Sequence, residues 1–447
     1  MKTGNEKSVI IAAAVLIVAM VASVAANMTP VYPLVLGLGL FSWIAFRGGF
    51  SIAEIIKMCI DGLCSAKVVL IMMLLIGMLT GSWRISGTIG YFVYYGIKLI
   101  RPWSFILIAF ILSSILSYAV GSSYAVAASA GVIFMSLAKA GGVNELITAG
   151  TIMSGIYVGD RGALASSSAM LVASVTETDH ISNVKRMLVT GALPFIVSLV
   201  LYIFYSVTNP ISSVDDSFVA GLENMFSFSF WCILPALIIL ILPLAGIAVW
   251  KAMVFSIITA TGVAIIEQNV AATDIVKTMI TGYASPTEFG RIFNGGGVLS
   301  MINVILIVAI SGMYAGIFNK TGMLNGIRGY IGKLMDRTGK FFATCCVGLL
   351  LSAIACNQSF PTVMSGTLFS DLYSERGASK EELASDMQNS FIVAVGLIPW
   401  TAASSGPLLF MGASPEALKY AFYLFLIPVI YGIGKRQFFR KDCNFST

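Results

Sequence analysis

The chain has 447 residues, of which 57% are hydrophobic and only 11% are charged, and its mean hydropathy is +0.91. A water-soluble core of ordinary composition cannot hide so much apolar surface, which excludes a soluble globular protein. The formal net charge is +6, but the basic residues are dispersed among short segments between apolar runs. The positive-inside bias of membrane proteins explains this distribution better than nucleic-acid binding does.

Apolar runs long enough to cross about 30 Å of hydrocarbon recur along the chain. They include residues 9–26, 105–120, 188–207, 230–249 and 298–316. These runs are continuous, whereas the strands of a membrane barrel would alternate apolar and polar residues over about ten positions. The sequence therefore predicts an all-α polytopic membrane protein with about 10–12 transmembrane segments.

The first apolar run, residues 9–26, follows Lys2 and Lys7 and is similar to the apolar part of a signal peptide. It is longer than usual for that role, and no convincing small-x-small cleavage site precedes Thr29 and Pro30, so we expect a retained first helix. The basic residues near both ends of the chain predict that both termini lie on the cytoplasmic side.

The chain repeats one pattern at an offset of about 235 residues. The motif WRISG at residues 83–87 is followed by a basic break, an apolar span and AVGSS at residues 119–123. The motif FNKTG at residues 318–322 is followed by the same series, which ends with ACNQS at residues 355–359. A duplicated half with small polar breaks inside its apolar spans is typical of secondary transporters built from inverted repeats.

This duplication divides the chain into five predicted parts. They are N-terminal scaffold helices at residues 1–66, a first repeat at 67–207, connecting helices and a loop at 208–296, a second repeat at 297–434, and a cytoplasmic tail at 435–447. The loop at 328–340 is richer in basic residues than the loop with Lys98 and Arg101. We therefore expect the 328–340 loop on the cytoplasmic side, with the other basic loop as an exception.

The two breaks are candidate binding sites. Ser122 and Ser123 in the first repeat precede an apolar piece too short to cross the bilayer comfortably, and so do Asn357, Gln358 and Ser359 in the second. Such pieces are typical of half-helices or re-entrant hairpins, whose free backbone groups and terminal dipoles can meet an ion or a substrate. A helix-packing motif of small residues is the alternative, and two corresponding breaks favour the binding site.

A second polar segment, residues 154–168, places Asp160 and Arg161 between two apolar stretches. Ionisable groups at bilayer depth are costly and mark ion paths or a neutralising pair. We predict that Asp160 binds Na⁺, or takes a proton when the ion leaves, with Ser166 and Ser167 as neutral ligands. A pair at the membrane edge that reaches out to water is the alternative.

The counterpart of this segment in the second repeat is neutral. Asn389 lies on an apolar helix, Pro399 then breaks the helix and frees a carbonyl, and Thr401 and Ser404 offer further oxygens. We predict that these neutral groups are ligands or line the cavity. Asp386 closely follows a charged run, and we assign it to that solvated segment.

No residue pattern indicates an enzyme. A phosphate-binding loop and a nucleophile elbow are both absent from the sequence, so hydrolytic chemistry and direct ATP drive have no support. The single histidine, His180, has charged neighbours that fit a solvated loop better than a pH sensor. The seven cysteines lack paired spacing and predict buried residues, not a metal site or a disulfide framework.

Two motifs carry a resemblance to a known family. Residues 149–161 (AGTIMSGIYVGDR) and 397–400 (LIPW) resemble the glycine-rich Gly-Asp-Lys segment and the Ile-Pro-Trp segment of the NhaC-type sodium/proton antiporter family, in the ion transporter superfamily. The resemblance covers about residues 76–412. It implies an inverted-repeat fold with re-entrant hairpins, exchange of Na⁺ for H⁺ across the cytoplasmic membrane of a prokaryote, and no bound cofactor.

Several acids of the family pattern are neutral in this chain. Ser167 replaces the acid of Ser-Asp-Thr-Thr, Asn357 that of Gly-Asp-Gln, and Gln388 and Asn389 those of Glu-Asp-Ser. Neutral oxygens still bind Na⁺ but take up fewer protons. The alternative is therefore a Na⁺- or H⁺-coupled transporter or exchanger of a small organic anion or amino acid, whose anionic group lies at a half-helix N-terminus beside Arg161.

The expected partners follow from the prediction of a membrane transporter. Membrane lipid and a small ion or small organic solute are expected, and nucleic acid is not. A homodimer is one assembly that the sequence allows.

Overall fold

The computed structural model describes residues 6–26, 28–99, 101–211, 216–285, 287 and 289–442. Within these residues all regular structure is helical, apart from one isolated bridge between Tyr283 and Gly295. The prediction of an all-α polytopic membrane protein is confirmed. Lys2, one of the basic residues used to orient the termini, lies outside the described residues.

Long apolar helices give fewer spans than the sequence predicts. In the described chain, six helices can cross a membrane by length and composition, or eight if two bent helix pairs each count as one span. A further four apolar helices have only 10–17 residues, among them Phe105–Val120 and Lys340–Ala355. The predicted number of ten to twelve spans is based on apolar runs in the sequence. It exceeds the six to eight spans of the structure because polar breaks cut several of these runs into shorter helices.

The helices of the two repeats follow the same order. The first repeat contains α4 (Lys67–Ile85), α5 (Thr88–Leu99), α6 (Phe105–Val120), α7 (Ser123–Val126), α8 (Val132–Ala140), α9 (Glu145–Gly162), α10 (Ser167–Thr176) and α11 (His180–Thr208). The second contains α17 (Ile302–Thr321), α18 (Arg328–Thr338), α19 (Lys340–Ala355), α20 (Ser359–Ser374), α21 (Lys380–Gln388), α22 (Phe391–Ala394), α23 (Ala402–Met411) and α24 (Phe422–Asp442). A π-helical turn at Ala127–Gly131 joins α7 to α8 in one helix, Ser123–Ala140, which corresponds to α20.

The remaining helices precede the first repeat or connect the two. They are α1 (Glu6–Ala25), α2 (Val31–Arg47), α3 (Ile52–Ser65), α12 (Asp216–Met225), α13 (Leu234–Leu244), α14 (Val249–Ile266), α15 (Ala272–Thr281) and α16 (Gly290–Phe293).

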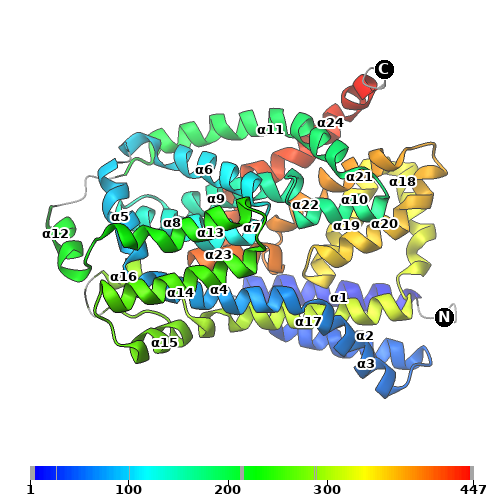
Figure 1. Cartoon of the computed structure of the whole chain (residues 1–447). Coiled ribbons are helices and arrows are strands. Elements are labelled where there is room, and N and C mark those ends of the chain that lie inside the picture. The colour runs from blue at the N-terminus through cyan, green and yellow to red at the C-terminus, as the bar shows by residue number, and fades with distance from the viewer. Residues whose placement is uncertain are drawn as a thin grey trace.

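The repeats run in opposite directions through the molecule. Figure 1 shows α5 at one end of the molecule and α18 at the other, so α6 and α19 start from opposite ends and both finish near the middle. The start of α1 and the end of α24 lie at the α18 end (Figure 1). The basic α18 and both ends of the described chain therefore share one side, opposite to Lys98 at the end of α5.

The two breaks are built from the same helix ending. Helix α6 is followed by Gly121 at φ 70°, and α19 by Cys356 at φ 54°, both in the left-handed region. Their N–H groups donate to the carbonyls of Ser117 and Ser352 in the last turn of each helix. The left-handed residue stops the helix and redirects the chain toward the next piece.

Close helix packing holds α9 against α6. A Cβ atom added at Gly159 would lie 2.0 Å from the backbone of Ser117, and one added at Gly155 would lie 2.6 Å from Ser113 Cβ. Small residues allow helices to approach this closely in membranes. The end of α9 is thus fixed beside the break that follows α6.

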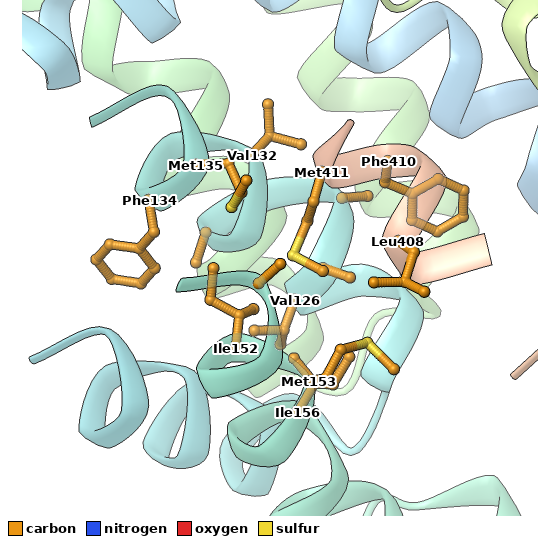
Figure 2. Packing of buried hydrophobic residues seen from close by; sticks show 14 of the residues in the cluster. Val126, Val132, Phe134, Met135, Ile152, Met153, Ile156, Leu408, Phe410 and Met411 are labelled. Carbon is orange, nitrogen blue, oxygen red and sulfur yellow. The ribbon is translucent and has the colours of Figure 1, made fainter. Parts of the chain in front are cut away.

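An apolar cluster joins the two repeats. Figure 2 shows Val132 and Met135 of α8 packed with Ile152 of α9 and with Phe410 and Met411 of α23. All five side chains are buried. Helices α8 and α9 of the first repeat therefore share a core with α23 of the second.

Candidate functional site

A cavity of about 430 Å³ lies where the broken helices meet. Four helices of the described chain begin at its wall, and their first residues include Ser123 of α7, Ser167 of α10, Ser359 of α20 and Ala402 of α23. The opposite wall comes from α3, α4 and α17, which contribute small and apolar side chains for the most part. Because helix starts carry the positive ends of the helix dipoles, they give this cavity a positive potential.

Asp160 is the sole carboxylate among the described residues that line the cavity. It lies in the last turn of α9 and is 7% exposed. Gln358 Nε2 donates to its Oδ2 at 3.3 Å, and Ser123 and Ser168 are within hydrogen-bonding reach of the carboxylate. The Asp160 carboxylate is therefore hydrogen-bonded by neutral donors.

The second break supplies polar groups from the other repeat. Gln358 Nε2 also donates to the carbonyl of Ile392 at 2.7 Å, so its amide connects Asp160 with α22. Asn357 Oδ1 accepts from the N–H of Phe360 at 2.9 Å and so caps the start of α20. Both side chains line the cavity, together with Ser359.

Two tyrosines that sequence reasoning missed close the cavity on one side. Tyr124 and Tyr157 line it, and their hydroxyls donate to the carbonyls of Ala402 and Ala403 at 2.7 and 2.9 Å. A tyrosine within an apolar helix is ordinarily a core residue, although a buried hydroxyl needs a partner. The position of Tyr124 directly after Gly121-Ser122-Ser123 was the available signal.

Several predicted ligands satisfy the backbone instead of lining the cavity. Thr401 Oγ1 donates to the carbonyls of Val395 and Ile398, both at 3.0 Å, and Ser404 Oγ also donates to the Ile398 carbonyl. These hydroxyls occupy the carbonyls exposed where the chain breaks before α23. Asn389 is buried at the C-cap of α21, and its Nδ2 donates to the Ser385 carbonyl at 2.8 Å.

Of the two serines predicted as neutral ligands, Ser167 lines the cavity and Ser166 does not. Ser167 lines the cavity, as Ser122 and Ser123 do. Ser166 is the N-cap of α10, where its Oγ accepts from the N–H of Ala169 at 3.2 Å and donates to the Asp160 carbonyl at 2.5 Å. Ser166 therefore fixes the backbone of Asp160 and does not contact the cavity.

Arg161 faces away from the cavity and is 1% exposed. Its guanidinium donates to the carbonyl of Met187, to Thr190 Oγ1 at 2.9 Å and to the Tyr423 hydroxyl at 3.1 Å. It lines a separate cavity of about 320 Å³ next to α11. Asp160 and Arg161 are thus both buried, on different sides of α9, and neither reaches out to water.

The assignment of Asp386 to a solvated run is wrong. The side chain is fully buried and accepts from the hydroxyls of Tyr373 and Tyr431 at 2.6 and 2.9 Å, and its Oδ2 pairs with Lys435 Nζ at 2.5 Å. Burial of this carboxylate is possible because it is both paired with a cation and hydrogen-bonded. This cluster ties α20 and α21 to α24, away from the Asp160 cavity.

The sequence of the chain is similar to those of known transporters. Residues 155–434 match the model of the Na⁺/H⁺ antiporter family. Similar relatives are an uncharacterized Na⁺/H⁺ antiporter of Haemophilus influenzae, with 25% identity over 84% of each chain, and the Na⁺/H⁺ antiporter NhaC of Bacillus subtilis, with 24% identity over 90% of this chain and 91% of the relative. The malate-2H⁺/Na⁺-lactate antiporter of Bacillus subtilis is 21% identical over 80% of this chain and 78% of its own.

Proposed function

Because the chain belongs to the Na⁺/H⁺ antiporter family, we propose that it exchanges Na⁺ for H⁺ by secondary active transport across the cytoplasmic membrane of a prokaryote. The observation that supports this proposal is the single carboxylate of Asp160 in a cavity of neutral oxygens, at the junction of two oppositely directed repeats. Binding at such a junction, beside half-helices, is the usual arrangement in inverted-repeat transporters.

One carboxylate accounts for the exchange. Asp160 binds either Na⁺ or a proton, because both neutralise the same negative charge and occupy the same oxygens. When the cavity faces one side of the membrane, Na⁺ displaces the proton from the carboxylate, or a proton displaces Na⁺. The carboxylate with its bound ion is then exposed to the other side. Ser122, Ser123, Asn357 and Gln358 contribute neutral donors and acceptors around the ion.

Vesicles test this function directly. Purified protein in vesicles that contain a pH-sensitive dye should move protons when Na⁺ is added outside, and Asp160→Asn should abolish the movement. Asp371→Asn is the matched control, since Asp371 is 64% exposed and pairs with Arg328 away from the cavity. Proton movement that persists in Asp160→Asn would overturn the assignment of Asp160.

A second candidate function has its own support. A cavity of about 430 Å³ is larger than a bare cation needs, and the four helix starts around it suit an anionic group. One relative is named a malate-2H⁺/Na⁺-lactate antiporter. The alternative is thus the exchange of a small organic anion together with Na⁺ or H⁺.

A thermal shift experiment separates the two candidates. Na⁺ alone should raise the unfolding temperature if the protein exchanges only cations. A shift that needs both Na⁺ and a carboxylate such as malate or lactate would favour the organic anion.

A further inference from the structure

We propose that Arg161 sets the affinity of the Asp160 cavity for Na⁺, because its fixed positive charge weakens cation binding and so allows release. This inference rests on the proposed function, in which Asp160 binds Na⁺. Arg161 touches neither the cavity nor the ion, and it therefore acts as a positioning residue through the electric field and through α9.

The geometry fixes the charge close to Asp160 but outside the cavity. The two residues are consecutive in the last turn of α9, so their Cα atoms are about 3.8 Å apart and their side chains diverge by about 100° around the helix. Asp160 points to the cavity, and Arg161 points to α11 and α24. Hydrogen bonds to the Met187 carbonyl, Thr190 and Tyr423 hold the guanidinium there.

The charge is not neutralised by the groups around it. Every described hydrogen-bond acceptor of Arg161 is neutral, and the described residues that line its own cavity include no aspartate or glutamate. Asp386, the buried acid of α21, is already paired with Lys435. The cavity of Arg161 is lined by apolar side chains such as Val158, Leu188 and Phe195, where solvent screens charges poorly.

The size of the effect follows from Coulomb's law. For charges about 10 Å apart in an effective dielectric of about 20, the repulsion between the guanidinium and a bound Na⁺ changes the affinity about tenfold. A purely structural role predicts the opposite sign. If Arg161 served only to hold α9 against α11 and α24, its loss would loosen the site and weaken Na⁺ binding.

The sign of the change in affinity therefore tests the proposal. Na⁺ binding to the purified full chain is measured calorimetrically at alkaline pH, where competition from protons is small. Arg161→Gln should bind Na⁺ about tenfold more tightly than the wild type. Its exchange in vesicles should show a lower KM for Na⁺ together with a lower kcat, because release becomes slower. Arg161→Lys keeps the charge and should restore the wild-type affinity.

Two further variants complete the experiment. Arg84→Gln is the matched control, because this buried arginine lies eleven residues beyond Met73 on α4, about 16 Å further from the cavity wall, and its loss should leave the Na⁺ affinity unchanged. Thr190→Asp places a carboxylate against the guanidinium, keeps Arg161, and should also tighten Na⁺ binding. It decides the question if Arg161→Gln does not fold.

The outcomes are distinct. Unchanged or weaker Na⁺ binding in a folded Arg161→Gln or Thr190→Asp protein would overturn the role of Arg161 while leaving the exchange function in place. A wild type that neither binds Na⁺ nor moves protons would overturn both. Tighter binding in both variants, with wild-type affinity in Arg161→Lys and Arg84→Gln, would establish the role.

Discussion

The Asp160 carboxylate has no cationic side chain beside it among the described residues that line its cavity. Gln358, Ser123 and Ser168 provide neutral contacts, and Arg161 lies on the other side of α9. A cation that enters the cavity therefore meets a single negative charge. Under the proposed function Asp160 holds one proton or one Na⁺ at a time, so the proposed exchange moves no net charge.

A substitution at Asn357 tests whether the number of carboxylates in the cavity sets the number of protons exchanged for each Na⁺. Asn357→Asp adds a second carboxylate to the cavity, so the site should take up an additional proton in each cycle, and exchange should become sensitive to membrane potential. The substitution also removes the hydrogen bond from Asn357 Nδ2 to the Ala355 carbonyl, which costs about 1–3 kcal/mol of stability. The rate of Na⁺-driven proton movement is compared with and without an imposed potassium diffusion potential. The wild-type rate should not depend on the potential. An Asn357→Asp rate that is also independent of the potential would contradict a link between the number of carboxylates and the number of protons.

Local sequence reveals only some of these residues. Asp160 could be predicted because an acid between two apolar stretches is visible within one segment. The environment of Asp386 could not be predicted, since its partner Tyr431 lies 45 residues further along the chain. Likewise, the sequence does not show which side of α9 Arg161 faces, nor that Thr401 serves exposed carbonyls.

At the scale of the elements, each break depends on one left-handed residue. Gly121 follows α6 at φ 70° and lies against the loop before α10, where a Cβ atom would be 2.4 Å from the backbone carbon of Ala165. Cys356 has the same role after α19, and its carbonyl accepts from the N–H of Ala402 at 2.8 Å. In each repeat the break therefore contacts the chain at the start of a later helix, α10 in the first repeat and α23 in the second, and this brings the helix starts together.

A substitution at Gly121 should disrupt this arrangement. Gly121→Ala combines the cost of a left-handed alanine with a clash against backbone, and we expect a loss of about 3 kcal/mol. Gly262→Ala is the matched control, because that glycine lies within α14 with open space around its Cβ position, and it should be neutral or stabilising by about 1 kcal/mol. Thermal unfolding in detergent measures both. Equal unfolding temperatures for the two variants would show that the break tolerates a side chain.

The cluster around Asp386 should matter for stability more than for ion binding. Lys435→Met leaves the buried carboxylate without its cation, and we expect a loss of about 3–5 kcal/mol of stability. Asp386→Asn combined with Lys435→Met should cost less than the sum of the two single changes, because the pair is removed together. Thermal unfolding of the four proteins gives the coupling. A strictly additive result would mean that the ion pair contributes nothing of its own.

At the scale of the whole molecule, the helical class and the duplication could be predicted from composition and from the 235-residue offset. The number of spans could not, because helix length depends on where the chain breaks in three dimensions. The apolar cluster that joins α8, α9 and α23 has no local signature either, since its members come from both repeats (Figure 2). Each side chain in it is an ordinary hydrophobic residue of a membrane helix.

The opposite directions of the repeats, with an acid at the Asp160 position of the first and none at its counterpart in the second, have a consequence for the transport cycle. In a transporter with two identical inverted halves, a two-fold rotation about an axis in the membrane plane would convert the inward-facing state into the outward-facing one, and the two states would have equal free energy. A charge present in only one half removes that degeneracy. The empty binding site should then face mainly one side of the membrane. The rates of exchange in the two directions should differ even under matched gradients.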